Sequence, residues 1–396
     1  MIHDPAHAFM PYPEVAVHGA ATGLLSGLSF AVKDLFDVAG YPTSGGSPIV
    51  LAMSGVKTRH ADAVQALLDA GARFVGKTIT DEFAFSMNGQ NAHFGAPLNG
   101  AAPLRISGGS SSGSASAVSN RLCDIALGTD TGGSVRAPAS QCGLVGLRPT
   151  HGRVSLRGAM DLAPSFDTCG WFTRDVPTFA RVADVLLGAD SPGSDAPPQL
   201  LWPEDLWALV APAALTPARE AAQRVQGVLG TARPVHAVLD SLDAMYWAFR
   251  RLQGREAWMC DGAVIERHAV PLGPGVAERF AWSRALTDVQ VAEAQAFRER
   301  FRRHLDTLLP PGAVMLLPTM PDIAPLRSEP ESALEDYRNR AIRLLCTAGL
   351  AGAPQLSLPL ASRDGAPLGV SLLGRPGSDR ALVALAERLS AAGVAA

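Results

Sequence analysis

The Gly/Ser-rich segment 104–158 contains two Gly-Gly-Ser turns whose serines could act as nucleophiles. The turns are Gly108-Gly109-Ser110 and Gly132-Gly133-Ser134, and their serines lie 24 positions apart. A serine hydroxyl attacks a carbonyl group only when a base removes its proton. Histidine is the usual base, but neither turn contains one. The base must therefore come from elsewhere in the chain.

Lysine is rare in this sequence, which makes each lysine a candidate base. Of the 34 Lys and Arg residues, only Lys33, Lys57 and Lys77 are lysines. Burial can lower the pKa of a lysine until it loses its proton near neutral pH, whereas arginine stays protonated. Lys33 follows an apolar run that predicts a strand over 28–32, and α/β proteins place active-site groups at such strand ends. We therefore predict that Lys33 is the base, and we interpret Lys57 and Lys77 as solvated surface charges.

The Gly/Ser-rich segment 104–158 does not fit several commoner interpretations. A flexible linker would not alternate with apolar runs as this segment does. A phosphate-binding loop needs GxxxxGK[ST], and no Gly-rich turn here precedes a lysine. Residues 109–113 match the short G-x-S-x-G pattern of α/β-hydrolases, but no acid and histidine follow in a recognisable setting. His93 and His151, which flank the two turns, are expected to have structural roles.

The second Gly-Gly-Ser turn could also stabilise negative charge. Consecutive glycines let backbone N–H groups converge on one point without obstruction by Cβ atoms. We therefore predict that Thr131, Gly132 and Gly133 contribute to an oxyanion-binding turn. Asp130 and Arg136 bracket this turn, and we expect them to form a buried ion pair that maintains its shape.

Short apolar runs alternate with helical patterns along the chain. Strands are predicted at 28–32, 73–78, 124–128, 314–318, 355–360 and 368–374. Helices are predicted at 61–72, 176–188, 216–229, 241–260, 277–308, 333–350 and 379–392. This alternation predicts an α/β fold in which helices cover a parallel or mixed sheet. Residues 189–200 are expected to form a surface loop within the same domain.

The composition excludes several classes of protein. Hydrophobic residues make up 47% and charged residues 18% of the 396 residues, which excludes wholesale disorder. The net charge of −3 argues against a nucleic-acid partner. The sequence shows no secretory signal, and no apolar stretch reaches about 18 residues, so we expect no membrane span. The five cysteines are scattered without metal-ligand spacing, which favours a reduced, cytoplasmic protein without disulfides or a metal site.

The segments that carry the serines and Lys33 resemble the amidase signature hydrolases. The resemblance rests on three motifs: AVKDLFDVAG at 31–40, GGSSSGSASAV at 108–118 and GTDTGGSVRAPASQCGLVGLRPTHGRVS at 128–155. Further matching stretches extend it over nearly the full chain, at 80–100, 165–175, 335–341 and 368–380. One departure is that Ser112-Gly113 stands where the family commonly has Gly-Gly.

The resemblance implies a Ser–Ser–Lys triad. By motif position, Lys33 would be the base, Ser110 the bridging serine after a cis peptide bond, and Ser134 the nucleophile. The reaction would convert a small-molecule amide to an acid and ammonia through an acyl-enzyme, without a metal or an organic cofactor.

The resemblance also implies one large α/β domain over 1–396, with a central mixed sheet covered by helices. The catalytic motifs lie within 28–175, and residues 310–392 would complete the sheet. Members of the family are monomers or homodimers, and either state is compatible with this chain.

The resemblance is strongest to the short, plant-type indole-3-acetamide hydrolases, so an arylacetamide is the expected substrate. The alternatives are a urea-like or carboxylated amide, as in biuret-type hydrolases, and the glutaminase role within a tRNA-dependent amidotransferase. A non-enzymatic scaffold is disfavoured because all three triad residues are present. A basic residue in the pocket would favour a carboxylated amide, and an aromatic lining an arylacetamide. Candidate lining residues, at least half of which we expect in the core instead, are Phe85, Met87, Trp171 and Phe172.

Overall fold

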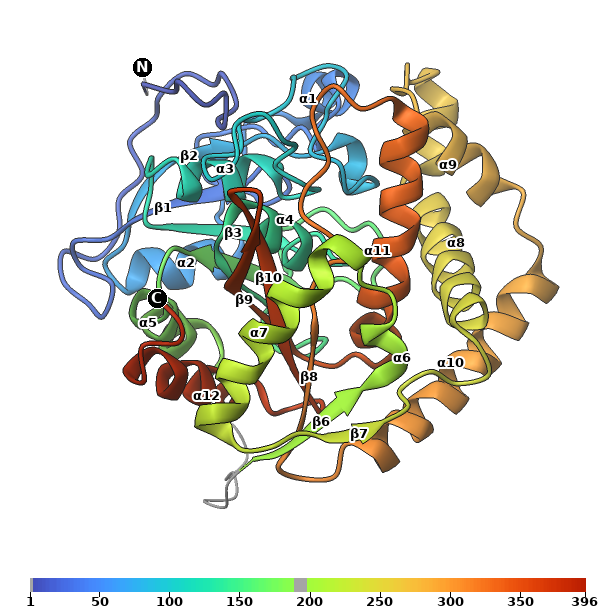
Figure 1. The fold of residues 1–396 in the computed structure, drawn as a ribbon. Coiled ribbons are helices and arrows are strands. Elements are labelled where there is room, and N and C mark those ends of the chain that lie inside the picture. Colours follow the sequence, from blue (N-terminus) through green and yellow to red (C-terminus); the bar gives the residue numbers. More distant parts are fainter. Residues whose placement is uncertain (1–2, 189–197) are drawn as a thin grey trace.

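The computed structural model describes residues 3–188 and 198–396, which fold around one ten-stranded sheet (Figure 1). From one edge to the other, the strands are β2 (Arg73–Thr78), β1 (Ser29–Lys33), β3 (Ile125–Thr129), β5 (Cys169–Thr173), β4 (Val145–Arg148), β9 (Gln355–Arg363), β10 (Ala366–Gly374), β8 (Ala313–Pro318), β6 (Gln199–Pro203) and β7 (Arg233–Val235). Parallel pairs at both ends of the sheet flank antiparallel pairs in its middle. The sheet is therefore mixed.

Six of the ten strands occur where the apolar runs predict them, namely β1, β2, β3, β8, β9 and β10. Strands β4 and β7 have only four and three residues, too few to show an alternating pattern. Strand β5 is buried on both faces and therefore does not alternate either. Strand β6 begins within the predicted loop 189–200, of which residues 189–197 lie outside the described residues.

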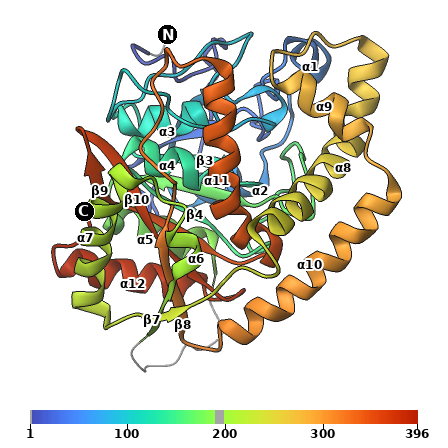
Figure 2. The ribbon, with the colours of Figure 1, turned by 45° about the vertical axis from the view of Figure 1, so that its right-hand side comes forward.

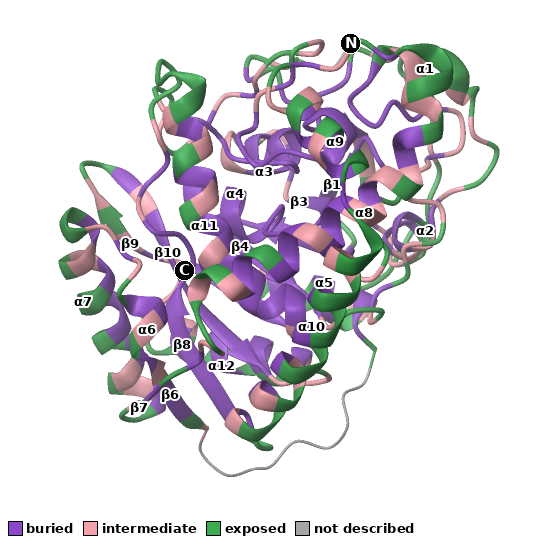
Figure 3. Cartoon of the chain, turned by 90° about the vertical axis from the view of Figure 1, so that its right-hand side faces the viewer, coloured by how far each residue is buried: buried purple, intermediate pink, exposed green. Residues whose placement is uncertain are grey.

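Twelve α-helices cover the sheet in the described residues: α1 (Pro48–Ser54), α2 (Asp62–Asp69), α3 (Ser112–Ser119), α4 (Arg136–Cys142), α5 (Val176–Leu186), α6 (Glu204–Trp207), α7 (Pro212–Leu229), α8 (Leu242–His268), α9 (Val276–Arg284), α10 (Asp288–Leu308), α11 (Glu331–Ala351) and α12 (Asp379–Ala391). Helices α8, α9 and α10 lie together on one side of the molecule, with α11 between them and the sheet (Figures 1 and 2). The strands are mostly buried, and exposed residues gather on the outer faces of the helices (Figure 3). Over the described ranges, none of the helices is both long and apolar enough to cross a membrane.

The prediction of one continuous helix over 277–308 is wrong, because the chain forms two helices there, α9 and α10. Thr287 precedes α10, and its Oγ1 accepts a hydrogen bond from the Gln290 N–H at 3.3 Å. The Gln290 side chain in turn accepts from the Thr287 N–H at 3.0 Å. This reciprocal cap satisfies N–H groups that a new helix would otherwise leave unpaired. The apolar period runs through the break and hides it in the sequence.

Helix α3 consists mainly of serine, glycine and alanine, and it is almost entirely buried. Serine and glycine are weak helix formers, so the sequence pattern does not predict this helix. Close packing requires its small residues, since a Cβ on Gly113 would lie 2.3 Å from the carbonyl oxygen of Ala8. The Ser114 hydroxyl donates to the Leu127 carbonyl of β3 at 2.8 Å. Helix α3 is thus fixed against β3, and its start fixes the first Gly-Gly-Ser turn.

Lys77 is fully buried, so its interpretation as a solvated surface charge is wrong. Its Nζ lies 2.6 Å from Asp34 Oδ1, and neither side chain is exposed. Nζ also donates to the Pro42 carbonyl at 2.6 Å and to Thr43 Oγ1 at 2.8 Å. Lys57, by contrast, is partly exposed. The buried pair joins the end of β2 to the loop that follows Lys33 in β1.

Replacing Lys77 with Met should destabilise the fold by about 3–5 kcal/mol, because Asp34 would be left buried without a cation. Urea unfolding monitored by circular dichroism measures this change in the free energy of unfolding. Lys57→Met is the matched control, because the Lys57–Asp37 pair at 3.5 Å is partly exposed. That variant should lose less than about 1 kcal/mol. Equal losses in the two variants would contradict the assignment of the buried pair.

Candidate active site

The candidate site lies where two parallel strands end. Strand β1 ends at Lys33, and its neighbour β3 ends at Thr129. Because β1 and β3 pair in parallel, their carboxyl ends lie side by side at one edge of the sheet. The second Gly-Gly-Ser turn follows β3 directly. Lys33 is fully buried at 0% exposure, at the strand end where the sequence predicts it.

Two hydroxyl groups bind the Lys33 amine. Nζ donates to Ser110 Oγ at 2.8 Å and to Thr129 Oγ1 at 2.7 Å. Burial lowers the pKa of Lys33 to about 7, against the opposing effect of nearby carboxylates, of which Asp81 has the largest. A neutral amine has one lone pair, so it can donate to Thr129 while it accepts a proton from Ser110. Sequence reasoning misses Thr129, whose place beside Lys33 depends on the pairing of β1 with β3.

Backbone contacts fix Ser110 beside the amine. The Gly109–Ser110 peptide bond is cis, as the family resemblance implies. The Ser110 carbonyl accepts hydrogen bonds from the Asp81 N–H at 3.1 Å and from Thr80 Oγ1 at 3.0 Å. A Cβ on Gly109 would lie 2.3 Å from the Asp81 carboxylate, so a larger residue does not fit. Ser111 Oγ instead donates to a backbone carbonyl of β3 at 3.2 Å. The amine therefore binds Ser110 and not its neighbour.

Asp81 is a buried acid beside this site that sequence reasoning does not identify. Its Oδ2 accepts from the Gly89 N–H at 3.0 Å, and its Oδ1 has no hydrogen-bond partner among the described residues. Burial raises the pKa of Asp81, while the Gly89 N–H and the charge of Lys33 oppose the rise. The position of Asp81 shortly after β2 could have indicated its place in the site, because β2 lies directly beside β1 in the sheet.

Asp130 binds two buried arginines, which confirms the predicted ion pair. Its Oδ1 lies 2.8 Å from Arg136 Nη2 and 3.1 Å from Arg148 Nη1, and all three side chains are unexposed. Burial alone would raise the pKa of Asp130, but the two guanidinium groups keep it well below its usual range. The carboxylate also accepts from the N–H groups of Gly133, Val135 and Arg136. Asp130 is therefore ionised and fixes the backbone of the turn.

This bonding pattern changes the predicted oxyanion site at one position. The Gly133 N–H donates to Asp130 Oδ1 at 2.9 Å, so it is not free to bind an oxyanion. Within the described parts of the chain, the N–H groups of Thr131, Gly132 and Ser134 have no acceptor. Gly133 has a φ of 128°, and a Cβ there would lie 2.4 Å from a leucine methyl group of α11. Gly133 thus shapes the turn, and its neighbours have the free donors.

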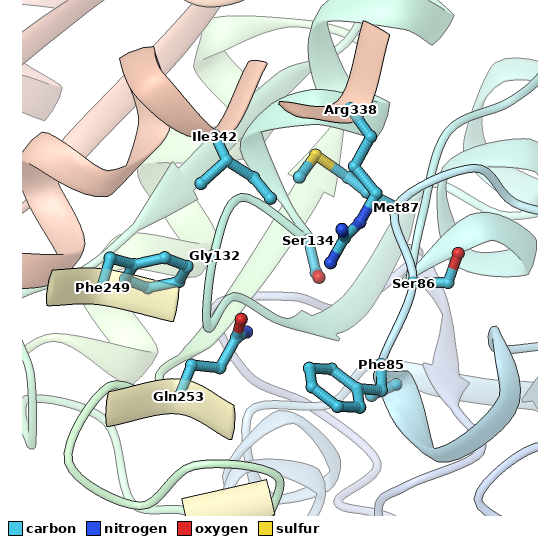
Figure 4. Close-up of a pocket in the computed structure, with 10 residues that line it drawn as sticks. Phe85, Ser86, Met87, Gly132, Ser134, Phe249, Gln253, Arg338 and Ile342 are labelled. Atoms are coloured by element: carbon cyan, nitrogen blue, oxygen red, sulfur yellow. The ribbon is translucent and has the colours of Figure 1, made fainter. Parts of the chain in front are cut away.

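Ser134 lines a narrow pocket together with residues from the short helix η1 (Glu82–Ala84), the loop after it, α8 and α11 (Figure 4). The cavity has a volume of about 10 Å³, which is room for about one water molecule. Ser134 Oγ makes no hydrogen bond to another described residue. The backbone carbonyl of Ser134 accepts a hydrogen bond from the Ser111 N–H at 3.3 Å, so the two Gly-Gly-Ser turns are in contact. The other lining residues are Ala84, Phe85, Ser86, Met87, Gly132, Phe249, Gln253, Arg338 and Ile342.

The candidate lining residues divide between pocket and core. Phe85 and Met87 line the pocket, whereas Trp171 and Phe172 belong to β5 and are fully buried in the core. Sequence reasoning does not identify Phe249 and Gln253, because α8 lies outside the matching stretches, and it does not single out Arg338 within the matching stretch 335–341.

The remaining reactive side chains are outside this pocket. His93 Nε2 lies 2.9 Å from Glu82 Oε1, and His151 Nε2 lies 2.8 Å from the Pro164 carbonyl oxygen. All five cysteines are free, and four of them are buried. Across residues 3–188 and 198–396, no group of His, Cys, Asp and Glu side chains is arranged to hold a metal ion. The assembled groups are instead those of nucleophilic catalysis: a buried amine, two serines and free N–H donors.

The chain is similar to several known proteins. A family model described as Amidase matches residues 9–219 and 268–383. Amidase 1 of Arabidopsis thaliana is 38% identical, and the match covers 93% of each chain. A glutamyl-tRNA(Gln) amidotransferase component from Methanothermobacter thermautotrophicus is 32% identical over 92% of this chain and 84% of that protein. A crystal structure of an amidase superposes with a TM-score of 0.83 at 33% identity, covering 94% of this chain and 86% of that one.

Proposed function

The chain belongs to the amidase family and is an amide hydrolase, and we propose that it cleaves a small carboxylic amide through Lys33, Ser110 and Ser134. The supporting observation is the fully buried Lys33 amine, whose pKa is lowered to about 7 and which lies 2.8 Å from Ser110 Oγ. In this arrangement the neutral amine takes the Ser110 proton, and Ser110 takes the proton of Ser134.

The proposed reaction proceeds through an acyl-enzyme. Ser134 Oγ attacks the amide carbonyl as its proton passes through Ser110 to Lys33. The free N–H groups of Thr131, Gly132 and Ser134 are candidates to stabilise the resulting oxyanion. The C–N bond then breaks, and ammonia leaves with a proton returned through Ser110. A water molecule, deprotonated by the same relay, hydrolyses the ester and releases the acid and Ser134.

The pocket supports a small substrate. Phe85, Met87, Phe249 and Ile342 would contact the carbon atoms of an acyl group. The motif resemblance to plant-type indole-3-acetamide hydrolases keeps an arylacetamide such as indole-3-acetamide as a candidate. Every candidate amide is larger than a cavity of about 10 Å³, so lining side chains must move for any of them to bind. Arg338 favours the second candidate, a urea-like or carboxylated amide, because it is the basic lining residue.

Similarity to the amidotransferase component keeps a glutaminase role as a further alternative. Release of ammonia from a panel of indole-3-acetamide, phenylacetamide, short aliphatic amides and glutamine separates these candidates. Strict dependence on glutamine would favour the glutaminase. The cytoplasmic location and the monomeric or homodimeric state also stay predictions.

Ser134→Ala and Lys33→Arg should each lower kcat for amide hydrolysis by at least about 1,000-fold. The first variant lacks the nucleophile, and the second keeps the charge but cannot accept a proton near neutral pH. Ammonia release under saturating substrate measures both effects. Ser47→Ala is the matched control from another Gly-Gly-Ser sequence, at 45–47, because Ser47 Oγ has no hydrogen-bond partner among the described residues. It should retain most of the activity.

Full activity of Ser134→Ala would exclude Ser134 as the nucleophile. An active Lys33→Arg variant would show that the reaction needs a positive charge at this position and not a base.

The pH dependence should follow the Lys33 amine. Because only the neutral amine accepts a proton, kcat/KM should fall as the pH decreases below about 7, approaching tenfold per pH unit. A neutral amide such as butyramide is the appropriate substrate, since it does not titrate in this range. A flat profile between about pH 5 and 8 would contradict a base with this pKa.

A further inference from the structure

The wall of the pocket opposite the triad carries a positive charge that the proposed mechanism does not use. Arg338 of α11 is only 3% exposed and lines the same pocket as Ser134. Figure 4 shows its guanidinium group pointing from α11 into the pocket, toward the Ser134 hydroxyl. A buried guanidinium aimed at a nucleophile is positioned to contact the substrate.

The hydrogen bonds of Arg338 are incomplete. Its Nη1 donates to Glu335 Oε1, one helical turn away, at 3.0 Å. Its Nε is buried without any hydrogen-bond partner in the described chain. Gln253, on the facing helix α8, likewise has a buried side-chain oxygen without a partner. Buried polar groups are normally satisfied, so the pocket lacks one acceptor for the arginine and one donor for the glutamine.

The charges around Arg338 are also unbalanced. Arg279 and Arg250 are buried beside it, and burial together with the charge of Arg338 lowers the pKa of each. Glu335 pairs with both Arg338 at 3.0 Å and Arg279 at 3.2 Å. Arg250 has no carboxylate partner within the described ranges, and its guanidinium lies over the Trp282 ring at 5.4 Å. Glu335 is therefore the one carboxylate in the described chain that pairs directly with any of these three guanidinium groups, and the charge of Glu331 also raises the pKa of Arg279.

We propose that Arg338 binds a carboxylate of the substrate, so that the enzyme acts on small amides that carry a carboxylate near the scissile carbonyl. This inference rests on the proposed function, because Ser134 defines where the carbonyl must lie. A carboxylate supplies the acceptor that Arg338 lacks and offsets the excess positive charge. The amide NH₂ supplies the donor that Gln253 lacks. The apolar lining then contacts the short carbon chain between the two groups.

A carboxylated amide also matches the polar groups of the pocket better than an aromatic amide does. An indole or phenyl ring offers neither an acceptor for Arg338 nor a negative charge.

The first test compares two amides with the unmodified enzyme. Succinamate and butyramide differ only in a carboxylate that replaces the terminal methyl group. We expect kcat/KM for succinamate to exceed that for butyramide by at least about tenfold. A preference for butyramide, or for indole-3-acetamide over succinamate, would overturn the inference, and this comparison needs no variant to fold.

The second test removes the guanidinium. In Arg338→Gln, the ratio of kcat/KM for succinamate to that for butyramide should fall by about 100-fold, and Arg338→Lys should restore part of it. Arg340→Gln is the matched control, because Arg340 is an exposed arginine on the same helix. Its ratio should not change. An unchanged ratio in a folded Arg338→Gln enzyme would overturn the inference.

Ser134→Ala separates failure of the inference from failure of the proposed function. If Ser134 is required but the ratio does not depend on Arg338, the carboxylate site is wrong and the proposed nucleophile stands. If Ser134→Ala still hydrolyses succinamate while the ratio depends on Arg338, the nucleophile is wrong and the carboxylate site stands.

Discussion

The hydrogen bond between a fully buried lysine amine and a serine hydroxyl is the interaction on which the candidate site depends. Lys33 is unexposed, and its partners are the hydroxyl groups of Ser110 and Thr129. Desolvation favours the neutral amine, and the surrounding carboxylates favour the charged one. Their balance lowers the pKa to about 7. Lys77 shows the contrast: it is buried just as deeply, but it contacts the carboxylate of Asp34 directly at 2.6 Å. One buried lysine is thus arranged as a base, and the other as half of an ion pair.

The rest of the fold provides the rigidity that this arrangement needs. The parallel pairing of β1 with β3 places Lys33 beside Thr129, and the packing of α3 fixes the turn that carries Ser110. Asp130, held by buried arginines, fixes the turn that carries Ser134. Three independent parts of the chain therefore meet at the strand ends. Helix α11 closes the pocket from the opposite side and adds the positive charge.

The sequence predicts the strands that carry the site and the family to which the chain belongs, because apolar runs and signature motifs are local features. It does not predict contacts that depend on pairing between distant segments. Thr129 becomes a partner of the amine only through sheet register, and Asp81 is close only because β2 lies next to β1. A lysine is normally expected at the surface, but Lys77 is buried because its amine pairs with the buried carboxylate of Asp34. The occupied Gly133 N–H depends on the side-chain geometry of Asp130, which no motif specifies.

The protonation state of Lys33 is the central claim, and the scarcity of lysine makes it directly measurable. With only three lysines in the chain, selective ¹³C labelling of lysine gives three Cε signals, which Lys57 and Lys77 variants assign. A titration followed by NMR then reports the pKa of each amine. We predict that Lys33 titrates near pH 7 in the folded protein. A Lys33 amine that stays protonated to its ordinary value of about 10.5 would contradict it.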